Sequence, residues 1–96
     1  MIRDRLAAAV EQALNEAREA GEIQYDRLPE ITLEPPKGKA FGDYTTNIAM
    51  VMAREARMAP RQLAEKIIPR LPSLGGLIER AEVAGAGYIN FYLKPT

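Results

Sequence analysis

The fold of this chain is decided by its last apolar stretch, Gly87-Tyr88-Ile89-Asn90-Phe91-Tyr92-Leu93-Lys94. Its residues alternate in character, which predicts a β-strand because successive side chains of a strand point to opposite faces of the sheet. One face of the predicted strand is apolar and consists of Ile89, Phe91 and Leu93. The other face carries Tyr88, Asn90, Tyr92 and Lys94.

This second face offers the groups that hold unpaired RNA bases. At a rise of about 3.3 Å per residue, two rings, an amide and a cation follow one another over about 20 Å. Rings stack on bases, an amide reads a base edge, and a cation meets phosphate. A solvated sheet face with cross-strand pairs is the alternative, since tyrosine is common in strands of every kind. The strand alone leaves both interpretations open.

The composition is that of one globular domain spanning residues 1–96. Thirteen basic and thirteen acidic residues give a formal net charge of zero. This balance argues against a general polyanion binder, whose affinity comes mostly from neutralised phosphates. Any contact with nucleic acid should therefore be local, or should gain affinity from a larger neighbouring part of a protein.

Two residue types that enzymes often use for catalysis are missing. The chain contains neither cysteine nor histidine, so it has no disulfide or thiol nucleophile and lacks the commonest general base and metal ligand. No pair of carboxylates accompanies a base or a nucleophile. We therefore expect no catalytic residue, no metal site and no cofactor-binding residue, and we expect the chain to be non-catalytic by itself.

No apolar run approaches the roughly 20 residues that span a bilayer. The first four residues do not begin a signal peptide. We therefore expect a cytoplasmic protein without a membrane partner.

The first half of the chain predicts a helix, a short strand and a second helix. Apolar residues at helical spacing mark a helix over residues 1–20, which Gly21 ends. Residues 31–34 alternate as a short strand that two prolines stop. After a loop over residues 37–42, Asp43 is expected to cap a helix from residue 44 to about 57.

The second half predicts one more helix and a hairpin. Pro60 suits the first turn of a helix, and Pro69 should kink or end that helix near Ile68. Residues 77–83 read as a strand that pairs with the closing strand through a glycine-containing turn. The order helix-strand-helix-helix-strand-strand predicts an α+β fold, a two-layer sandwich with a small antiparallel sheet.

The loop before Asp43 is a second candidate for contact with RNA. Lys37 and Lys39 shortly precede Phe41 in this loop, and a ring beside cations can contact both base and backbone. The alternative is a solvated loop whose phenylalanine packs against the core.

Three blocks of sequence carry a resemblance to a known family. They are Phe41-Gly42-Asp43-Tyr44-Thr45-Thr46-Asn47-Ile48-Ala49-Met50, Pro60-Arg61-Gln62-Leu63-Ala64-Glu65, and Val83-Ala84-Gly85-Ala86-Gly87-Tyr88-Ile89-Asn90-Phe91-Tyr92-Leu93. The chain resembles the amino-terminal additional domain of arginyl-tRNA synthetases, which shows Gly-Asp-Tyr/Phe-x-x-Asn, Pro-Arg-x-x-Ala and Ala-Gly-Pro-Gly-Phe/Tyr-Ile-Asn-Phe. The resemblance covers almost the whole chain, in the same order.

The resemblance implies a role in binding tRNA. In the family this domain packs ahead of the catalytic domain of the same polypeptide and touches the outer corner, or elbow, of the tRNA at the D-loop. An aromatic residue and an asparagine two positions later meet a D-loop base, and these roles fall on Tyr88 and Asn90. Tyr92 lies beyond them on the same face, and Lys94 is placed for the RNA backbone beside a domain junction.

The resemblance also implies an activity that these residues do not perform. The family joins arginine to its tRNA with ATP and magnesium, through class I catalytic motifs. The His-x-Gly-His type motif is impossible here, and no Lys-Met-Ser-Lys type segment is present. Because Thr96 falls about where a catalytic domain would begin, we expect a domain excised from a ligase, without its catalytic and anticodon-binding domains.

Two positions depart from the family pattern. Ala86 replaces a proline between the two glycines, which leaves the hairpin turn less rigid. Phe41 stands where many members have histidine, so a ring is kept and a donor lost. The alternative to a tRNA-contacting role is a module for structural packing or protein interaction, with little RNA contact of its own.

Overall fold

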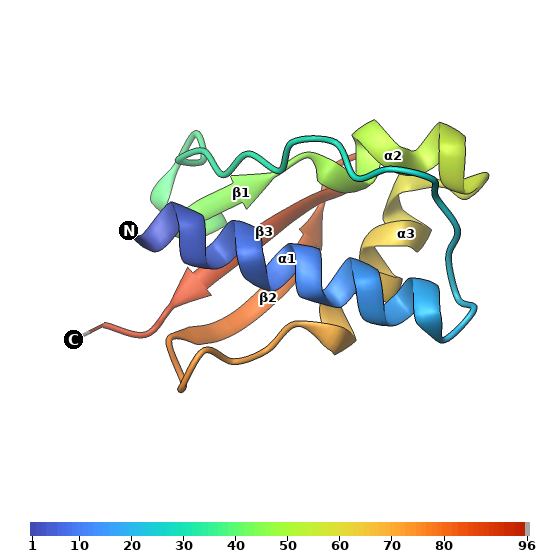
Figure 1. The fold of residues 1–96 in the computed structure, drawn as a ribbon. Helices are drawn as coiled ribbons and strands as arrows, with labels where there is room; N and C mark the ends of the chain where they lie inside the picture. Colours follow the sequence, from blue (N-terminus) through green and yellow to red (C-terminus); the bar gives the residue numbers. More distant parts are fainter. Residues whose placement is uncertain (96) are drawn as a thin grey trace.

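The protein has two layers, one of helices and one of strands. The computed structural model describes residues 1–95, apart from the side chain of Lys39. Its elements are α1 (Ile2–Glu19), η1 (Lys39–Phe41), β1 (Tyr44–Thr46), α2 (Ile48–Ala56), α3 (Pro60–Ile67), η2 (Ile68–Arg70), β2 (Ile78–Ala84) and β3 (Tyr88–Leu93). The strands form an antiparallel sheet in the order β1-β3-β2, and the α-helices cover one of its faces (Figure 1). The predicted α+β sandwich with a small antiparallel sheet is confirmed.

The core lies between the helices and the inner face of β3. Ile89 and Phe91 are completely buried, as are Leu6 and Leu14 on α1. Leu93 is partly buried and packs against the same cluster. The apolar face predicted for the closing strand is therefore the face that the helices cover. This arrangement leaves the opposite face of the central strand for other contacts.

Helices α1 and α3 begin and end close to the predicted residues. After α1 the chain turns at Gly21, whose φ of +78° is rarely adopted by other residues. Pro60 opens α3, and the α-helix ends at Ile67. Pro69 lies in the tighter turn η2, because a proline inside a helix removes a backbone hydrogen bond.

The helix predicted from residue 44 is wrong in its first turn. Residues Tyr44–Thr46 form β1 and pair with β3, in a register that places Thr45 opposite Asn90. Asp43 does not cap a helix, because its carboxylate accepts a hydrogen bond from the backbone N–H of Leu93 at 2.8 Å. Helix α2 begins only at Ile48, whose N–H donates to the hydroxyl of Thr46 at 3.3 Å.

The strand predicted over residues 31–34 is also wrong. In this segment the structure shows a single bridge, in which the backbones of Glu34 and Thr45 exchange two hydrogen bonds of 2.9 and 2.8 Å. Leu33 is nevertheless buried in the core. The alternation of residue types therefore predicted which side chain is buried. The strand does not continue, because Pro35 and Pro36 lack the N–H groups that would extend the pairing.

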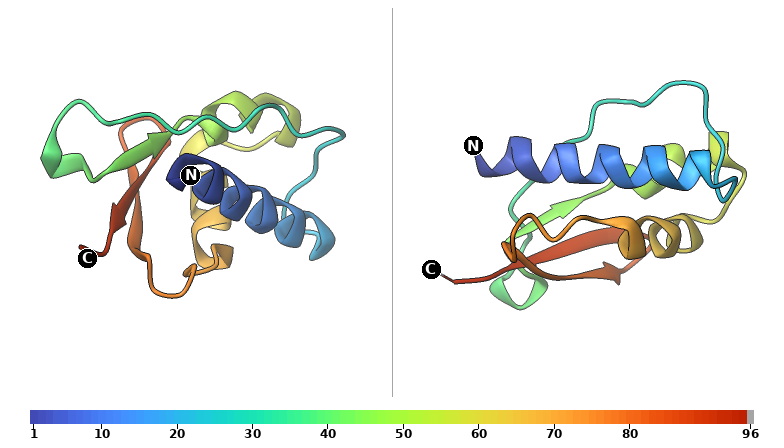
Figure 2. Two further views of the ribbon diagram at one scale, coloured as in Figure 1. Left: turned by 60° about the vertical axis from the view of Figure 1, so that its left-hand side comes forward. Right: turned by 60° about the horizontal axis from the view of Figure 1, so that its bottom comes forward.

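The segment that follows this bridge passes to the outer face of the sheet. Both views in Figure 2 show η1 on the side of the sheet opposite to α1. The predicted loop over residues 37–42 thus contains a short helical turn and covers part of the outer face. Within residues 1–95, no helix is both long enough and apolar enough to cross a membrane.

Candidate nucleic-acid interface

The outer face of the sheet carries a groove between the central strand and residues 35–41. Its volume is about 400 Å³. It is lined by Pro35, Pro36, Lys37, Phe41, Thr45, Ala84, Tyr88 and Asn90. We call it the outer groove, and we call residues 35–43 its wall. Four residues predicted from sequence to contact RNA, from two segments some 50 residues apart, therefore line one hollow.

The two rings of the outer groove are open to solvent. Phe41 is 52% exposed and Tyr88 is 42% exposed. Large apolar groups are normally withdrawn from water, so exposed rings beside a hollow indicate a surface for contact. The alternative in which Phe41 packs against the core is not what the structure shows.

Asn90 is more buried than a residue on a solvated strand face would be. It is only 4% exposed, because it sits on the central strand between Thr45 on β1 and Glu82 on β2. The hydroxyl of Thr45 donates to the carbonyl of Ile89 at 3.3 Å. The amide of Asn90 thus lies at the inner end of the outer groove, where a ligand can approach from one side.

Tyr92 shares the face of Tyr88 and Asn90 but does not line the outer groove. Its hydroxyl donates to the carbonyl oxygen of Ala40 at 3.0 Å. The guanidinium of Arg80 lies 3.9 Å from the centre of its ring. A hydrogen bond from the same guanidinium to Glu82, 2.8 Å long, raises the pKa of Arg80. Tyr92 is therefore engaged within the protein.

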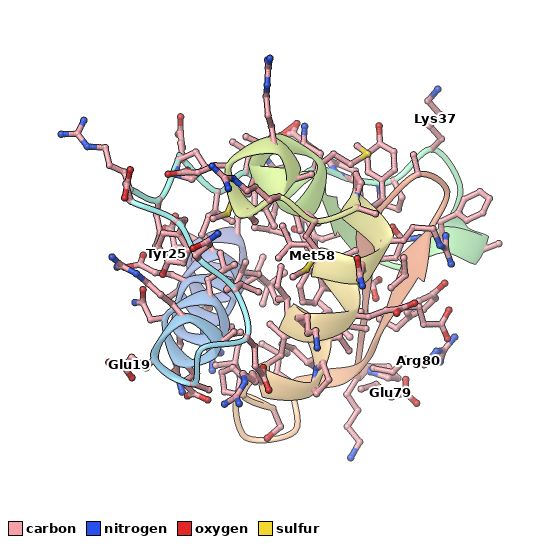
Figure 3. All side chains as sticks on the ribbon, turned by 90° about the vertical axis from the view of Figure 1, so that its right-hand side faces the viewer. Glu19, Tyr25, Lys37, Met58, Glu79 and Arg80 are labelled. Carbon is pink, nitrogen blue, oxygen red and sulfur yellow. The ribbon has the colours of Figure 1, made fainter. Side chains whose placement is uncertain are left out.

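The three predicted lysines differ in their positions. Lys37 lines the outer groove and extends away from the body, on the side that carries the sheet (Figure 3). Lys94 is exposed beyond the end of β3, outside the lining of the groove, and its backbone N–H donates to the carbonyl of Leu77 at 2.8 Å. The side chain of Lys39 lies outside the described part of the chain.

The first of the three sequence blocks, around Gly42 and Asp43, ties the wall to the central strand. A Cβ at Gly42 would stand 2.5 Å from the carbonyl oxygen of Phe91, so only glycine fits. The N–H of Asp43 donates to that same oxygen at 2.8 Å. With the bond from Leu93 to its carboxylate, Asp43 fixes the end of the wall against β3.

The Pro-Arg block holds the hairpin turn that precedes Tyr88. A Cβ at Gly87 would stand 2.5 Å from the Cβ of Pro60, so the turn packs directly on the first turn of α3. Arg61 donates from its guanidinium to the carbonyl of Gly85 at 2.6 Å. The three blocks of the sequence therefore meet around β3 and set the positions of Tyr88 and Asn90.

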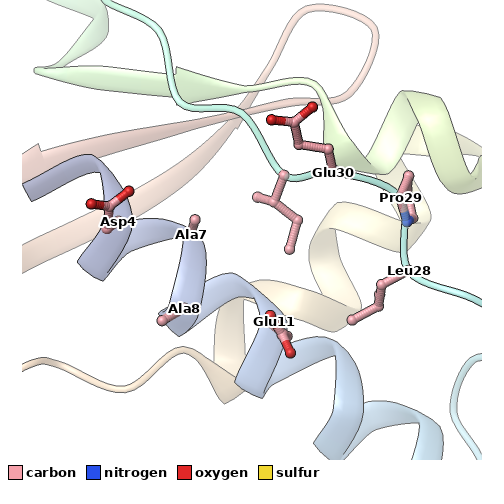
Figure 4. Close-up of a pocket in the computed structure, with 8 residues that line it drawn as sticks. Asp4, Ala7, Ala8, Glu11, Leu28, Pro29 and Glu30 are labelled. Carbon is pink, nitrogen blue, oxygen red and sulfur yellow. The ribbon is translucent and has the colours of Figure 1, made fainter.

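A second hollow lies between α1 and the segment 28–31 (Figure 4). Its volume is about 480 Å³, and Asp4, Glu11 and Glu30 are among its lining residues. The lining thus contains three carboxylates and no lysine or arginine, which makes this hollow unsuitable for RNA. Within residues 1–95, no cluster of acidic side chains is arranged to hold a metal ion.

Sequence reasoning missed the residues that shape the outer groove. Pro35, Pro36 and Ala84 line it, yet in the sequence they read as a strand stop and a turn. The proline pair was the available signal, because two adjacent prolines stiffen a segment and favour extended backbone. The contacts of Arg61 and Asp43 join residues 24 and 50 positions apart, and no local pattern reports them.

The fold and the outer groove define a class of protein, a two-layer α+β module with an aromatic groove on the outer face of its central strand. Residues 4–93 match the family model described as "Arginyl tRNA synthetase N terminal domain". The chain belongs to this family.

Curated relatives and solved structures are similar over nearly the whole chain. An arginine–tRNA ligase of Heliobacterium modesticaldum is 53% identical over 92 residues, and one of Listeria monocytogenes is 51% identical over 89. These matches cover 96% and 93% of this chain but only 16% of each relative. The Thermus thermophilus arginyl-tRNA synthetase structure superposes with a TM-score of 0.75 at 30% identity, over 98% of this chain and 14% of that one.

A more distant structure supports the fold alone. The arginyl-tRNA synthetase of Plasmodium falciparum gives a TM-score of 0.76 at 14% identity, over 97% of this chain and 16% of that one. The fold is thus shared by chains whose sequences have largely diverged.

Proposed function

We propose that this chain is the tRNA-binding accessory domain of an arginine–tRNA ligase, and that it contacts the D-loop at the elbow of the tRNA. The rest of that ligase would join arginine to its tRNA in the cytoplasm, using ATP and magnesium. The observation that carries the proposal is the outer groove, which combines two exposed rings, a buried amide and a lysine.

Each group in the outer groove has a defined task in this proposal. An unstacked base enters beside Tyr88 and Phe41, whose rings replace the stacking that the base loses, worth about 1–3 kcal/mol per base. The amide of Asn90 donates and accepts at the edge of the base. Because Asn90 is 4% exposed, a base with a mismatched edge would leave that amide without a partner, which gives discrimination.

The charge of the chain limits how strongly it grips RNA alone. Its net charge is zero, and Lys37 is the cation among the residues that line the outer groove. Affinity for the tRNA backbone would therefore come mainly from the catalytic domain of the same polypeptide, and this domain would add a local contact.

The proposal predicts a specific kinetic defect when the groove is altered in the full-length ligase. Tyr88→Ala and Asn90→Ala should raise the KM for tRNA, Tyr88→Ala by about 5- to 150-fold if a full stacking contact is lost. Tyr88→Phe keeps the ring and should stay close to the parent. The KM values for arginine and ATP, measured at saturating tRNA, should not change.

Two controls complete this experiment. Val51 is 53% exposed on α2, so Val51→Ala removes a comparably exposed apolar group away from the groove and should leave the KM for tRNA unchanged. A tRNA lacking the contacted D-loop base should be insensitive to Tyr88→Ala. If both groove variants charge intact tRNA like the parent, the domain is a packing or protein-interaction module instead.

A further inference from the structure

Tyr92 connects the central strand to the wall of the outer groove. Its hydroxyl donates to the carbonyl oxygen of Ala40 at 3.0 Å. Ala40 is the middle residue of η1, and the next residue is Phe41, the exposed ring of the wall. Tyr92, which does not line the groove, is therefore hydrogen-bonded to the residue that precedes Phe41, which does.

The ring of Tyr92 is braced within the protein. Arg80 covers it at 3.9 Å, and Glu82 holds Arg80 through a 2.8 Å hydrogen bond. The chain at Gly42 also approaches the ring, since a Cβ there would lie 3.5 Å from it. Tyr92 can hardly serve as a platform for a base, but it is well placed as a fixed anchor.

The wall needs such an anchor between its two ends. It begins after the bridge of Glu34 with Thr45, and it ends at Asp43, which is bonded to Phe91 and Leu93. A single turn such as η1 has little stability of its own. The hydrogen bond from Tyr92 ties this turn to the sheet between the two ends.

We propose that Tyr92 is a positioning residue for tRNA binding, which acts through Phe41 by keeping the wall in place before RNA arrives. This inference rests on the proposed function. A wall that is already ordered does not have to lose conformational freedom when the base enters, so less binding energy is lost. The hydroxyl of Tyr92 should then affect tRNA binding without touching tRNA.

The substitution Tyr92→Phe in the full-length ligase tests this inference. It removes the donor and keeps the ring under Arg80. Loss of one such hydrogen bond should raise the KM for tRNA about two- to tenfold, with kcat and the KM for arginine unchanged.

A matched control separates positioning from general stability. Tyr25→Phe removes a hydroxyl that donates to Asn15 Oδ1 at 2.6 Å, on the helical side of the protein. It should lower the thermal midpoint while leaving the KM for tRNA unchanged. An equal rise of this KM in both variants would mean that Tyr92 acts only through overall stability, which overturns the inference.

A double-mutant cycle tests the path through Phe41. If the hydroxyl works by placing that ring, Tyr92→Phe should add little to the defect of Phe41→Ala. Fully additive effects would show that Tyr92 acts independently of Phe41 and would overturn the inference.

The outcome with Tyr88 distinguishes the two proposals. If Tyr88→Ala raises the KM for tRNA and Tyr92→Phe does not, the positioning role falls and the proposed function stands. If neither does, the proposed function fails and the inference falls with it.

Discussion

At the scale of single residues, the site depends on where backbone atoms come close together. Gly42 and Gly87 stand where a side chain would strike another part of the chain, a carbonyl oxygen of β3 in one case and Pro60 in the other. Asn90 is likewise buried by residues distant in sequence, because it lies between Thr45 on β1 and Glu82 on β2. These close approaches hold the wall and the hairpin turn against the strand that carries Tyr88 and Asn90.

Gly42→Ala should destabilise the protein more than an ordinary substitution at a positive φ angle. Gly76 is the matched control, since its φ of +91° is close to the +96° of Gly42 and nothing lies within 4 Å of an added Cβ. Gly76→Ala should cost about 1–2 kcal/mol, a fall in the thermal midpoint of about 4–16 °C for a domain of this size. Gly42→Ala should add about 1–3 kcal/mol for the forced shift against Phe91. Thermal unfolding followed by circular dichroism measures both, and equal midpoints would refute the close approach.

At the scale of elements, the N-terminal turn of α3 holds the hairpin that presents Tyr88. Arg61→Ala removes the 2.6 Å hydrogen bond to the carbonyl of Gly85. Opening of the turn should become about two- to tenfold easier, because a net hydrogen bond contributes about 0.5–1.5 kcal/mol. The measurement is hydrogen exchange at the amide of Gly87, which donates within the turn to Ala84 at 3.1 Å. Gln62→Ala, at the adjacent exposed position, should leave that exchange rate unchanged.

Local patterns were sufficient for the elements that depend on local interactions. The periodicity of residues 1–20, Pro60 at a helix start and the alternation in β3 all predicted the structure, because burial and backbone chemistry act within a few residues. Residues 44–46 were predicted as helix, since Asp43 is a good cap by type. Its carboxylate instead meets Leu93, 50 residues away, and tertiary pairing with β3 outweighs a preference of this size.

The distinction between local patterns and contacts far apart in sequence also applies to the site. The face of β3 was predictable from a two-residue period, and with it Tyr88 and Asn90 as neighbours. That Lys37 and Phe41 join them, while Tyr92 does not, depends on how the wall folds across the sheet. This path is set by contacts between Asp43, Gly42 and β3, which lie far apart in sequence and leave no periodic signal.

At the scale of the whole molecule, a net charge of zero sets the expected behaviour of the isolated chain toward tRNA. It should bind weakly, and its affinity should fall only gently with salt, since each neutralised phosphate contributes about 0.7–0.9 to the slope of log K against log salt. If one or two phosphates are met, the slope should be about −1 to −2. A titration of the isotopically labelled chain with tRNA, followed by NMR at several salt concentrations, measures this slope.

Lys37 is the residue whose charge should appear in that slope. It lines the outer groove and extends into solvent, so Lys37→Ala should reduce the magnitude of the slope by about 0.7–0.9. Lys66 on α3 is the matched control, because it lines a different hollow with Glu22 and Arg70, and Lys66→Ala should leave the slope as it is. Equal slopes in the two variants would show that Lys37 does not contact an RNA phosphate. A steep slope that neither variant changes would show that the chain meets RNA through a surface other than the outer groove.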